Sequence, residues 1–134
     1  MKRFALYLIF LVLFSLAGKS QNLQAYLSYS VFNTPDNNSF VETYLTVNGS
    51  SIKYKQLNDG NYQGTIDVQI LFKVGDSIVN YAKYDLSGPI ISDTLKGKVN
   101  MLDVQRYVLP NGEYNIVISL SDKNKDQKPI VSYD

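Results

Sequence analysis

The residues whose spacing comes nearest to a known ligand set are Asp122, Asn124 and Asp126, which repeat the first three ligand positions of a calcium-binding loop. The match ends there. Gln127 stands where the sharp turn of such a loop needs glycine, and Tyr133 stands where a bidentate glutamate is expected. We therefore interpret this segment as a solvated, charged loop between strands and predict no metal site.

Acid–base and nucleophilic chemistry lack their usual residues. The sequence has no histidine and no cysteine, which removes the commonest general base, the usual partner of a serine nucleophile and all thiolate metal ligands. The carboxylates are spread through expected turns and polar faces, with no pair that the strand register brings together. No spacing marks a serine–lysine nucleophile. We predict that the protein is not an enzyme and has no catalytic residues and no cofactor.

Tyrosine is the residue type that can bind a ligand without acid–base chemistry. There are eleven tyrosines, ten of them after residue 20. Exposed rings stack on sugars or contact proteins, but tyrosine is also common in strands and at the rim of a sheet. Compared with Tyr62 and Tyr114, four rings are expected to point outward: Tyr26, Tyr44, Tyr81 and Tyr107.

The segment Leu109-Pro110-Asn111-Gly112-Glu113-Tyr114 is the most specific local pattern in the chain. Many β-sandwiches place a tyrosine just after such a turn and bond its hydroxyl to nearby backbone. The pattern predicts a structural tyrosine corner at Tyr114. The alternative is a hairpin tyrosine that faces solvent.

Two tripeptides, Asp76-Ser77-Ile78 and Asp93-Thr94-Leu95, place an aspartate before a hydroxyl residue and an aliphatic residue after it. This pattern resembles the O-glycosylation acceptor of some Bacteroidota. Both tripeptides fall where a turn or a crossing is expected, which suits an exposed acceptor. Ser77 and Thr94 are therefore candidate O-glycosylation sites.

The elements that must position these residues are strands. Apolar and polar residues alternate with period two, and Gly, Asn, Asp or Pro interrupts the pattern at short intervals. The sequence predicts strands over residues 24–33, 40–47, 51–57, 62–74, 77–86, 99–109, 114–120 and, where the chain ends, 129–134. Asn48-Gly49 predicts a hairpin turn with positive φ. Residues 99–109 also fit a short helix, but we assign a strand.

One face of the strand over residues 62–74 is expected to be core. Tyr62, Gly64, Ile66, Val68, Ile70, Phe72 and Val74 all fall on it. Residues 90–98 are expected to cross from one sheet to the other. The whole pattern predicts an all-β fold, an antiparallel two-sheet immunoglobulin-like sandwich of about seven strands.

The start of the chain has the layout of a secretory signal peptide. Residues 1–3 carry positive charge, and residues 4–17 are almost wholly apolar but too few to span a bilayer. Cleavage is expected after Ala17 or after Ser20, and we prefer the second, which leaves Gln21 as the new N-terminus. No cysteine follows, which excludes a bacterial lipoprotein anchor. We predict an exported protein (periplasm, cell surface or secreted) with no membrane span in the mature chain.

Residues 1–20 are therefore taken as the signal peptide and residues 21–134 as a single β-sandwich domain. Removing the signal peptide removes three of 13 basic residues and leaves ten against twelve acidic ones, a formal charge of −2. This charge gives no support to a nucleic-acid partner. Without cysteine, stability must come from apolar burial and strand pairing. The domain either ends at Asp134 or is completed by residues beyond it.

Four segments together resemble a known family: residues 25–29 (AYLSY), 40–45 (FVETYL), 62–64 (YQG) and 109–114 (LPNGEY). They are similar to the N-terminal region of exported Bacteroidota proteins that carry a GWxTD domain, and the similarity covers residues 24–128. It implies a β-rich N-terminal module of a longer protein whose biochemical role is largely uncharacterised. The sequence has no tryptophan and so lacks the GWxTD motif itself. No functional residue is carried over.

From these observations we expect a non-catalytic exported module with an interaction or structural role. Antiparallel sandwiches leave unpaired backbone at their edges, so edge strands and loop tips are expected to make the contacts. The partner is expected to be a protein, either of the cell envelope or another domain of the same chain. The alternative is a carbohydrate-binding module that uses exposed tyrosines. A hydrolase built on carboxylates is a third class, which we do not expect.

Overall fold

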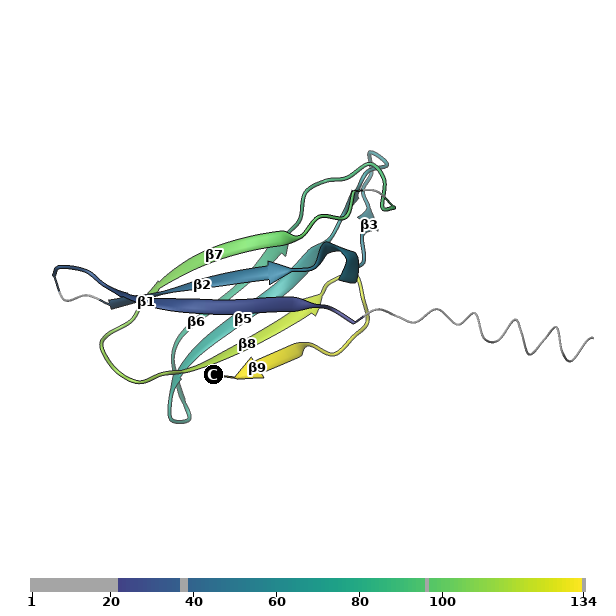
Figure 1. Ribbon diagram of the computed structural model, residues 1–134. Coiled ribbons are helices and arrows are strands. Elements are labelled where there is room, and N and C mark those ends of the chain that lie inside the picture. The colour runs from purple at the N-terminus through teal and green to yellow at the C-terminus, as the bar shows by residue number, and fades with distance from the viewer. Residues whose placement is uncertain (1–21, 37–38, 96, 134) are drawn as a thin grey trace, which may run out of the picture.

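The computed structural model describes residues 22–36, 39–95 and 97–133, which form a two-layer antiparallel β-sandwich (Figure 1). The predicted signal peptide, residues 1–20, lies outside the described residues. In the described part of the chain, no helix is long and apolar enough to cross a membrane.

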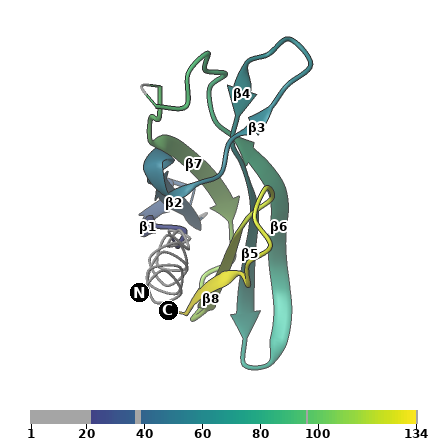
Figure 2. The same ribbon diagram turned by 90° about the vertical axis from the view of Figure 1, so that its right-hand side faces the viewer.

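Within the described ranges, seven strands build the two layers, and every neighbouring pair is antiparallel. The first sheet has the spatial order β1 (Ala25–Asn33), β2 (Ser39–Val47) and β7 (Met101–Val108). The second has the order β6 (Ser77–Ser87), β5 (Thr65–Val74), β8 (Asn115–Asp122) and β9 (Ile130–Tyr133). A small hairpin of β3 (Lys55–Gln56) and β4 (Tyr62–Gln63) extends beyond one end of the sandwich (Figure 2).

The connections follow the immunoglobulin-like pattern. The chain passes from the first sheet to the second between β2 and β5, returns between β6 and β7, and crosses again between β7 and β8. Residues 88–100, which include the expected crossing segment, make the second of these passages. Strands that alternate between two facing sheets in this way define an immunoglobulin-like sandwich. The predicted all-β sandwich is confirmed.

The core lies between the layers and is centred on β5. Ile66, Val68, Ile70 and Phe72 are at most 1% exposed, because β5 pairs with β6 on one side and β8 on the other. The expected inward face does not reach Val74, which is exposed. The register between β5 and β6 shifts directly after Phe72, and such a bulge turns the end of the hairpin out of the core.

The predicted hairpin turn at Asn48-Gly49 is wrong. Asn48 has an ordinary extended φ of −68°, and its side chain accepts a hydrogen bond from the Ser50 N–H at the start of the short 3₁₀ helix η1 (Gly49–Ser51). Gly49 is required by space and not by positive φ, because a Cβ there would lie 1.9 Å from the Val99 carbonyl oxygen. The strand predicted over residues 51–57 shrinks to Lys55–Gln56 as a consequence.

Candidate functional site

Strand β7 reverses the usual alternation of a sandwich strand over much of its length, although Met101 at its start and the Tyr107 ring face the core. Leu102, Val104 and Val108 point away from the core and are 74%, 57% and 71% exposed. The polar residues between them, Asp103 and Gln105, face the second sheet. A strand normally turns its apolar residues inward. Polar groups on the inner face of β7 must therefore find partners, and its outer face exposes apolar surface.

The inward polar residues of β7 are paired with one another and with β6. The Tyr84 hydroxyl donates to Asp103 Oδ2 at 2.5 Å, and Gln105 Nε2 donates to Asp103 Oδ1 at 3.0 Å. Burial, and then the hydrogen bond to Asp103, raise the pKa of Tyr84 well above its usual value. The Tyr107 ring packs 4.9 Å from Phe72. The Asp103 carboxylate is therefore paired at the interior edge where β6 meets β7, whereas the buried Tyr107 hydroxyl has no hydrogen-bond partner among the described residues.

The exposed residues of β7 belong to a larger surface, the outer face of the β1-β2-β7 sheet. The strand register places these twelve residues on it: Tyr26, Ser28, Ser30 and Phe32 from β1, Phe40, Glu42, Tyr44 and Thr46 from β2, and Leu102, Val104, Arg106 and Val108 from β7. Seven of the twelve are aromatic or aliphatic. An outer face of this kind is unusually apolar for a sheet that meets only water.

A charged cluster lies at the centre of this outer face. Arg106 Nε donates to Glu42 Oε1 at 2.9 Å, its Nη2 donates to the same oxygen, and the Tyr44 hydroxyl donates to Glu42 Oε2 at 2.5 Å. The Tyr44 hydrogen bond, and then the Arg106 hydrogen bonds, hold the pKa of Glu42 below its usual value. The Arg106 guanidinium lies 4.6 Å from the centre of the Phe40 ring, which stacks on Phe32 at 5.1 Å. The cluster fixes the side chains around it.

The second sheet has an ordinary outer face. Its alternate residues on β5 include Thr65, Asp67 and Gln69, and Asp67 lies 3.8 Å from Lys83 of β6. Lys123 Nζ lies 2.6 Å from Asp85 Oδ2 on the same side. The two outer faces therefore differ in kind, because one is mainly polar and the other mainly apolar.

The four tyrosines that the alternation predicts to point outward differ in their exposure in the structure. Tyr26 and Tyr81 are 76% and 69% exposed, but they belong to different sheets and so lie on opposite outer faces. Tyr44 is on the outer face of the first sheet and is half-buried. The prediction for Tyr107 is wrong, since its ring faces the core for the same reason that β7 is reversed.

Tyr114 lies just before β8, at the turn between the two sheets. Its hydroxyl donates to the Pro110 carbonyl oxygen at 2.7 Å. A tyrosine at this corner that bonds to backbone four residues earlier closes the turn in β-sandwiches. Its role here is structural.

The two candidate glycosylation residues lie in separate parts of the fold. Ser77 is exposed at the first position of β6, directly after the hairpin turn that contains Gly75 with a φ of 58°. Thr94 is half-buried in the 88–100 connection, where Asp93 Oδ1 accepts the Leu95 N–H at 2.7 Å. Both hydroxyl residues are thus at turns, but the structure does not bring them together.

Asp122, the first residue of the calcium-like spacing, has a structural task. Its buried carboxylate accepts the Lys53 N–H at 2.6 Å and the Asn124 N–H at 2.9 Å. The bond from Lys53 fastens the segment before β3 to the end of β8, and the bond from Asn124 closes the turn that follows β8. Among residues 22–36, 39–95 and 97–133, no group of three or more His, Cys, Asp or Glu side chains is arranged to hold a metal ion.

Two hollows in the surface have no local signal in the sequence. A groove of about 510 Å³ opens between β1 and the β8–β9 edge, lined by apolar residues such as Leu27, Ile118 and Ile130. A second hollow of about 400 Å³ lies at the β3-β4 end of the sandwich. Residues from at least three separate segments line each one, so only the folded register could have revealed them.

Fold and surfaces together define an immunoglobulin-like β-sandwich with one apolar outer face. No protein-family model matches the chain, and searches among curated proteins and among solved structures find no match.

Proposed function

We propose that the chain is a non-catalytic interaction module of an exported envelope or secreted protein, and that it docks through the outer face of the β1-β2-β7 sheet. The observation that carries this proposal is the outward side of β7, where Leu102, Val104 and Val108 are each more than half exposed. Contiguous apolar surface of this kind marks an interaction site on a soluble domain. Export is supported by the charged and then apolar order of residues 1–20.

The partner that this face fits best is a second copy of itself. Both members of the Glu42–Arg106 pair lie at its centre, and apolar side chains flank the pair along the strands. In a two-fold dimer every contact occurs twice, so Glu42 of one copy can face Arg106 of the other. A face with both charges at its centre and apolar groups around them is self-complementary.

Sedimentation velocity of the chain, purified after export, tests this proposal over a series of concentrations. We expect a reversible dimer with a dissociation constant of roughly 1–100 µM, because the face is small. The double variant Leu102→Ser with Val108→Ser should be monomeric at the same concentrations. The matched control, Ile78→Ser with Val79→Ser, removes two exposed apolar side chains from the β5-β6 hairpin and should dimerise like the wild type.

Two results would overturn homotypic docking. One is a wild-type chain that stays monomeric up to about 1 mM. The other is a photo-crosslinker at position 104 that links to a different protein domain and never to a second copy. A crosslinker at Val79 provides the matched position on the other sheet.

Carbohydrate binding is a second candidate function, and one observation favours it. Tyr54 and Tyr62 both line the hollow at the β3-β4 end of the sandwich. Tyr26 and Tyr81, the two most exposed rings among the described side chains of the sheets, cannot form one platform because they lie on opposite faces. A sugar site is therefore expected at the end of the sandwich and not on the sheets.

A further inference from the structure

We propose that the hollow at the β3-β4 end binds an acidic sugar, a hexuronate unit of a glycan. We define this end pocket by six of its lining residues: Lys53, Tyr54, Tyr62, Thr94, Lys98 and Lys125. Its volume of about 400 Å³ lies in the range of small-molecule sites. The proposal develops the carbohydrate alternative and does not depend on dimerisation.

The charge of the end pocket selects an anion. Lys53, Lys98 and Lys125 come from three separate segments, and no carboxylate is found among the described residues that line the pocket. Lys125 Nζ donates to the Ser51 carbonyl oxygen at 2.7 Å and lies 4.0 Å from Asp122, which offsets part of its charge. Within the described ranges, the exposed side chains of Lys53 and Lys98 make no ion pair. Their ammonium groups are therefore available to a ligand.

The backbone around the pocket is cross-linked, so the site is largely formed before a ligand arrives. The Tyr62 N–H donates to the Ile91 carbonyl oxygen at 2.8 Å, and the Tyr62 carbonyl oxygen accepts from the Ile91 N–H at 2.9 Å, which joins β4 to the 88–100 connection. The Lys53 N–H is held by Asp122, and Asn124 Nδ2 donates to the Lys53 carbonyl at 2.9 Å. A preorganised site loses less conformational entropy on binding.

The Tyr62 ring distinguishes a sugar from a bare anion. Tyr62 is half-buried beside the lysines, and an aromatic ring offers an apolar surface to the C–H face of a sugar, whereas Tyr54 lines the pocket but packs against the core. A lysine ammonium is a point charge that suits a single carboxylate without the fixed geometry of arginine. One carboxylate on a six-membered sugar ring combines these two demands. A hexuronate is the simplest ligand that meets both.

NMR titration of the ¹⁵N-labelled chain with a digalacturonate tests the proposal, and a neutral disaccharide and inorganic phosphate serve as comparison ligands. We expect saturable shifts around Lys53, Tyr62 and Lys98 with a dissociation constant of about 1 mM, and weaker binding at higher salt. The neutral sugar and phosphate should each bind at least about tenfold more weakly.

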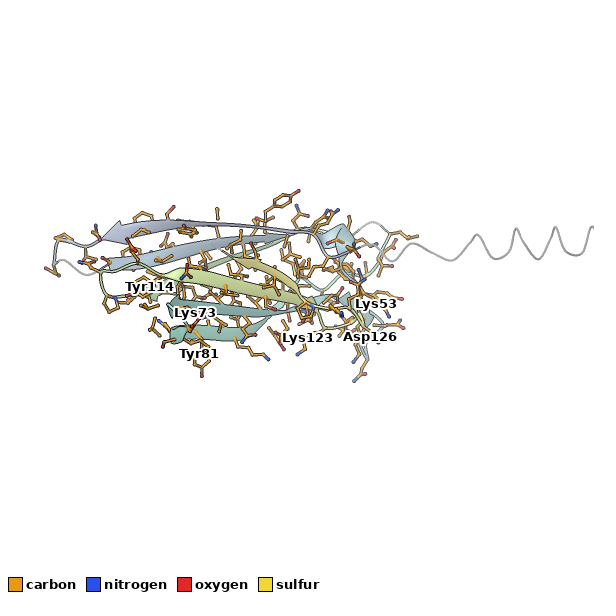
Figure 3. The ribbon with its side chains drawn as sticks, turned by 90° about the horizontal axis from the view of Figure 1, so that it is seen from below. Lys53, Lys73, Tyr81, Tyr114, Lys123 and Asp126 are labelled. Carbon is orange, nitrogen blue, oxygen red and sulfur yellow. The ribbon has the colours of Figure 1, made fainter. Side chains whose placement is uncertain are left out.

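Single substitutions test the contributions of the lysine charges and of the tyrosine ring to binding separately. Lys53→Gln and Lys98→Gln should each weaken digalacturonate binding about fivefold. Tyr62→Leu should weaken the sugar but leave phosphate unchanged. The matched control is Lys123→Gln, because Lys123 lies at the same end of the sandwich as Lys53 (Figure 3) but pairs with Asp85 outside the pocket.

Three results would overturn the acidic-sugar site. They are equal binding of the neutral sugar, phosphate binding as strong as that of digalacturonate, and no saturable shift up to about 20 mM. The double variant Leu102→Ser with Val108→Ser should bind digalacturonate like the wild type. Digalacturonate binding by this variant therefore tests the end pocket independently of dimerisation through the outer face.

Discussion

Glu42 is the residue of the outer face whose protonation is expected to make the stability of the fold depend on pH. The Tyr44 hydroxyl and the Arg106 guanidinium stabilise its carboxylate and lower its pKa. A lowered pKa in the folded state gives stability that is present above the unfolded-state pKa and is lost as pH falls through the folded-state value. We therefore expect Glu42→Gln to lower the urea midpoint at pH 7 and to have little effect near pH 3.

The control for this pH experiment is Glu113→Gln. Glu113 is exposed, and it makes no ion pair in the part of the chain that the structure describes. Its replacement should leave the midpoint unchanged at both pH values. A Glu42→Gln effect of equal size at pH 7 and pH 3 would contradict the electrostatic explanation and indicate a packing role for the side chain.

Gly49 is a residue whose size alone is decisive. A Cβ at this position would lie 1.9 Å from the Val99 carbonyl oxygen, which is backbone and cannot turn aside. We expect Gly49→Ala to cost about 3 kcal/mol of unfolding free energy. Ser50→Ala, at the exposed next residue, should change it by less than about 0.5 kcal/mol. Equal midpoints for the two variants in urea would show that the 88–100 connection moves away freely.

At the scale of the element, the corner before β8 depends on a single hydroxyl. Tyr114→Phe removes the hydrogen bond to the Pro110 carbonyl and keeps the ring. We expect a loss of about 1 kcal/mol of unfolding free energy by urea denaturation. Tyr81→Phe, which removes a hydroxyl from an exposed ring, should have no measurable effect. Equal losses in the two variants would contradict a structural role for the Tyr114 hydroxyl.

The sequence could predict those strands in which the apolar residues of the alternating pattern are also the residues that the fold buries. On β5, Ile66, Val68 and Ile70 alternate with polar residues, and a strand with partners on both sides buries one such face fully. The alternation therefore sufficed to predict the strand and its core face over residues 66–72, but not the division of the predicted strand 62–74 into β4 and β5. The break after Phe72 escaped prediction because a bulge depends on the partner strand and leaves no local signal.

The candidate surfaces could not be predicted because they depend on pairing. In β7 the pattern alone predicts that Leu102, Val104 and Val108 share a face, but not that this face is the outer one. The hydrogen bond from the Tyr84 hydroxyl of β6 to the Asp103 carboxylate holds Asp103 on the inner side, and this leaves the three aliphatic residues on the outer side. The lysines of the end pocket, such as Lys53 and Lys98, are far apart in sequence and meet only through the fold.

At the scale of the whole molecule, the sandwich is closed along one side and open along the other. The β6 and β7 edges are in contact and are joined by the Tyr84–Asp103 hydrogen bond. Along the opposite side, β1 and the β8–β9 edge leave the apolar groove of about 510 Å³ between them. The inward residues of β1 become more exposed toward its end, since Leu27 is half-buried while Val31 is 62% exposed. The fold is therefore less stable against local opening along this side.

Amide hydrogen exchange should reveal this difference between the two sides. Strand β5 pairs on both edges and carries the most buried side chains, whereas β1, among the strands that the structure describes, pairs only with β2 and borders the groove. We expect amides of β5 to exchange slowest and those of β1 at least about tenfold faster than those of β2, the central strand of the same sheet. Equal protection of β1 and β2 would mean that a second surface covers the free edge of β1. Since docking over the outer face leaves that edge unpaired, the exchange pattern also tells edge pairing apart from face-to-face dimerisation.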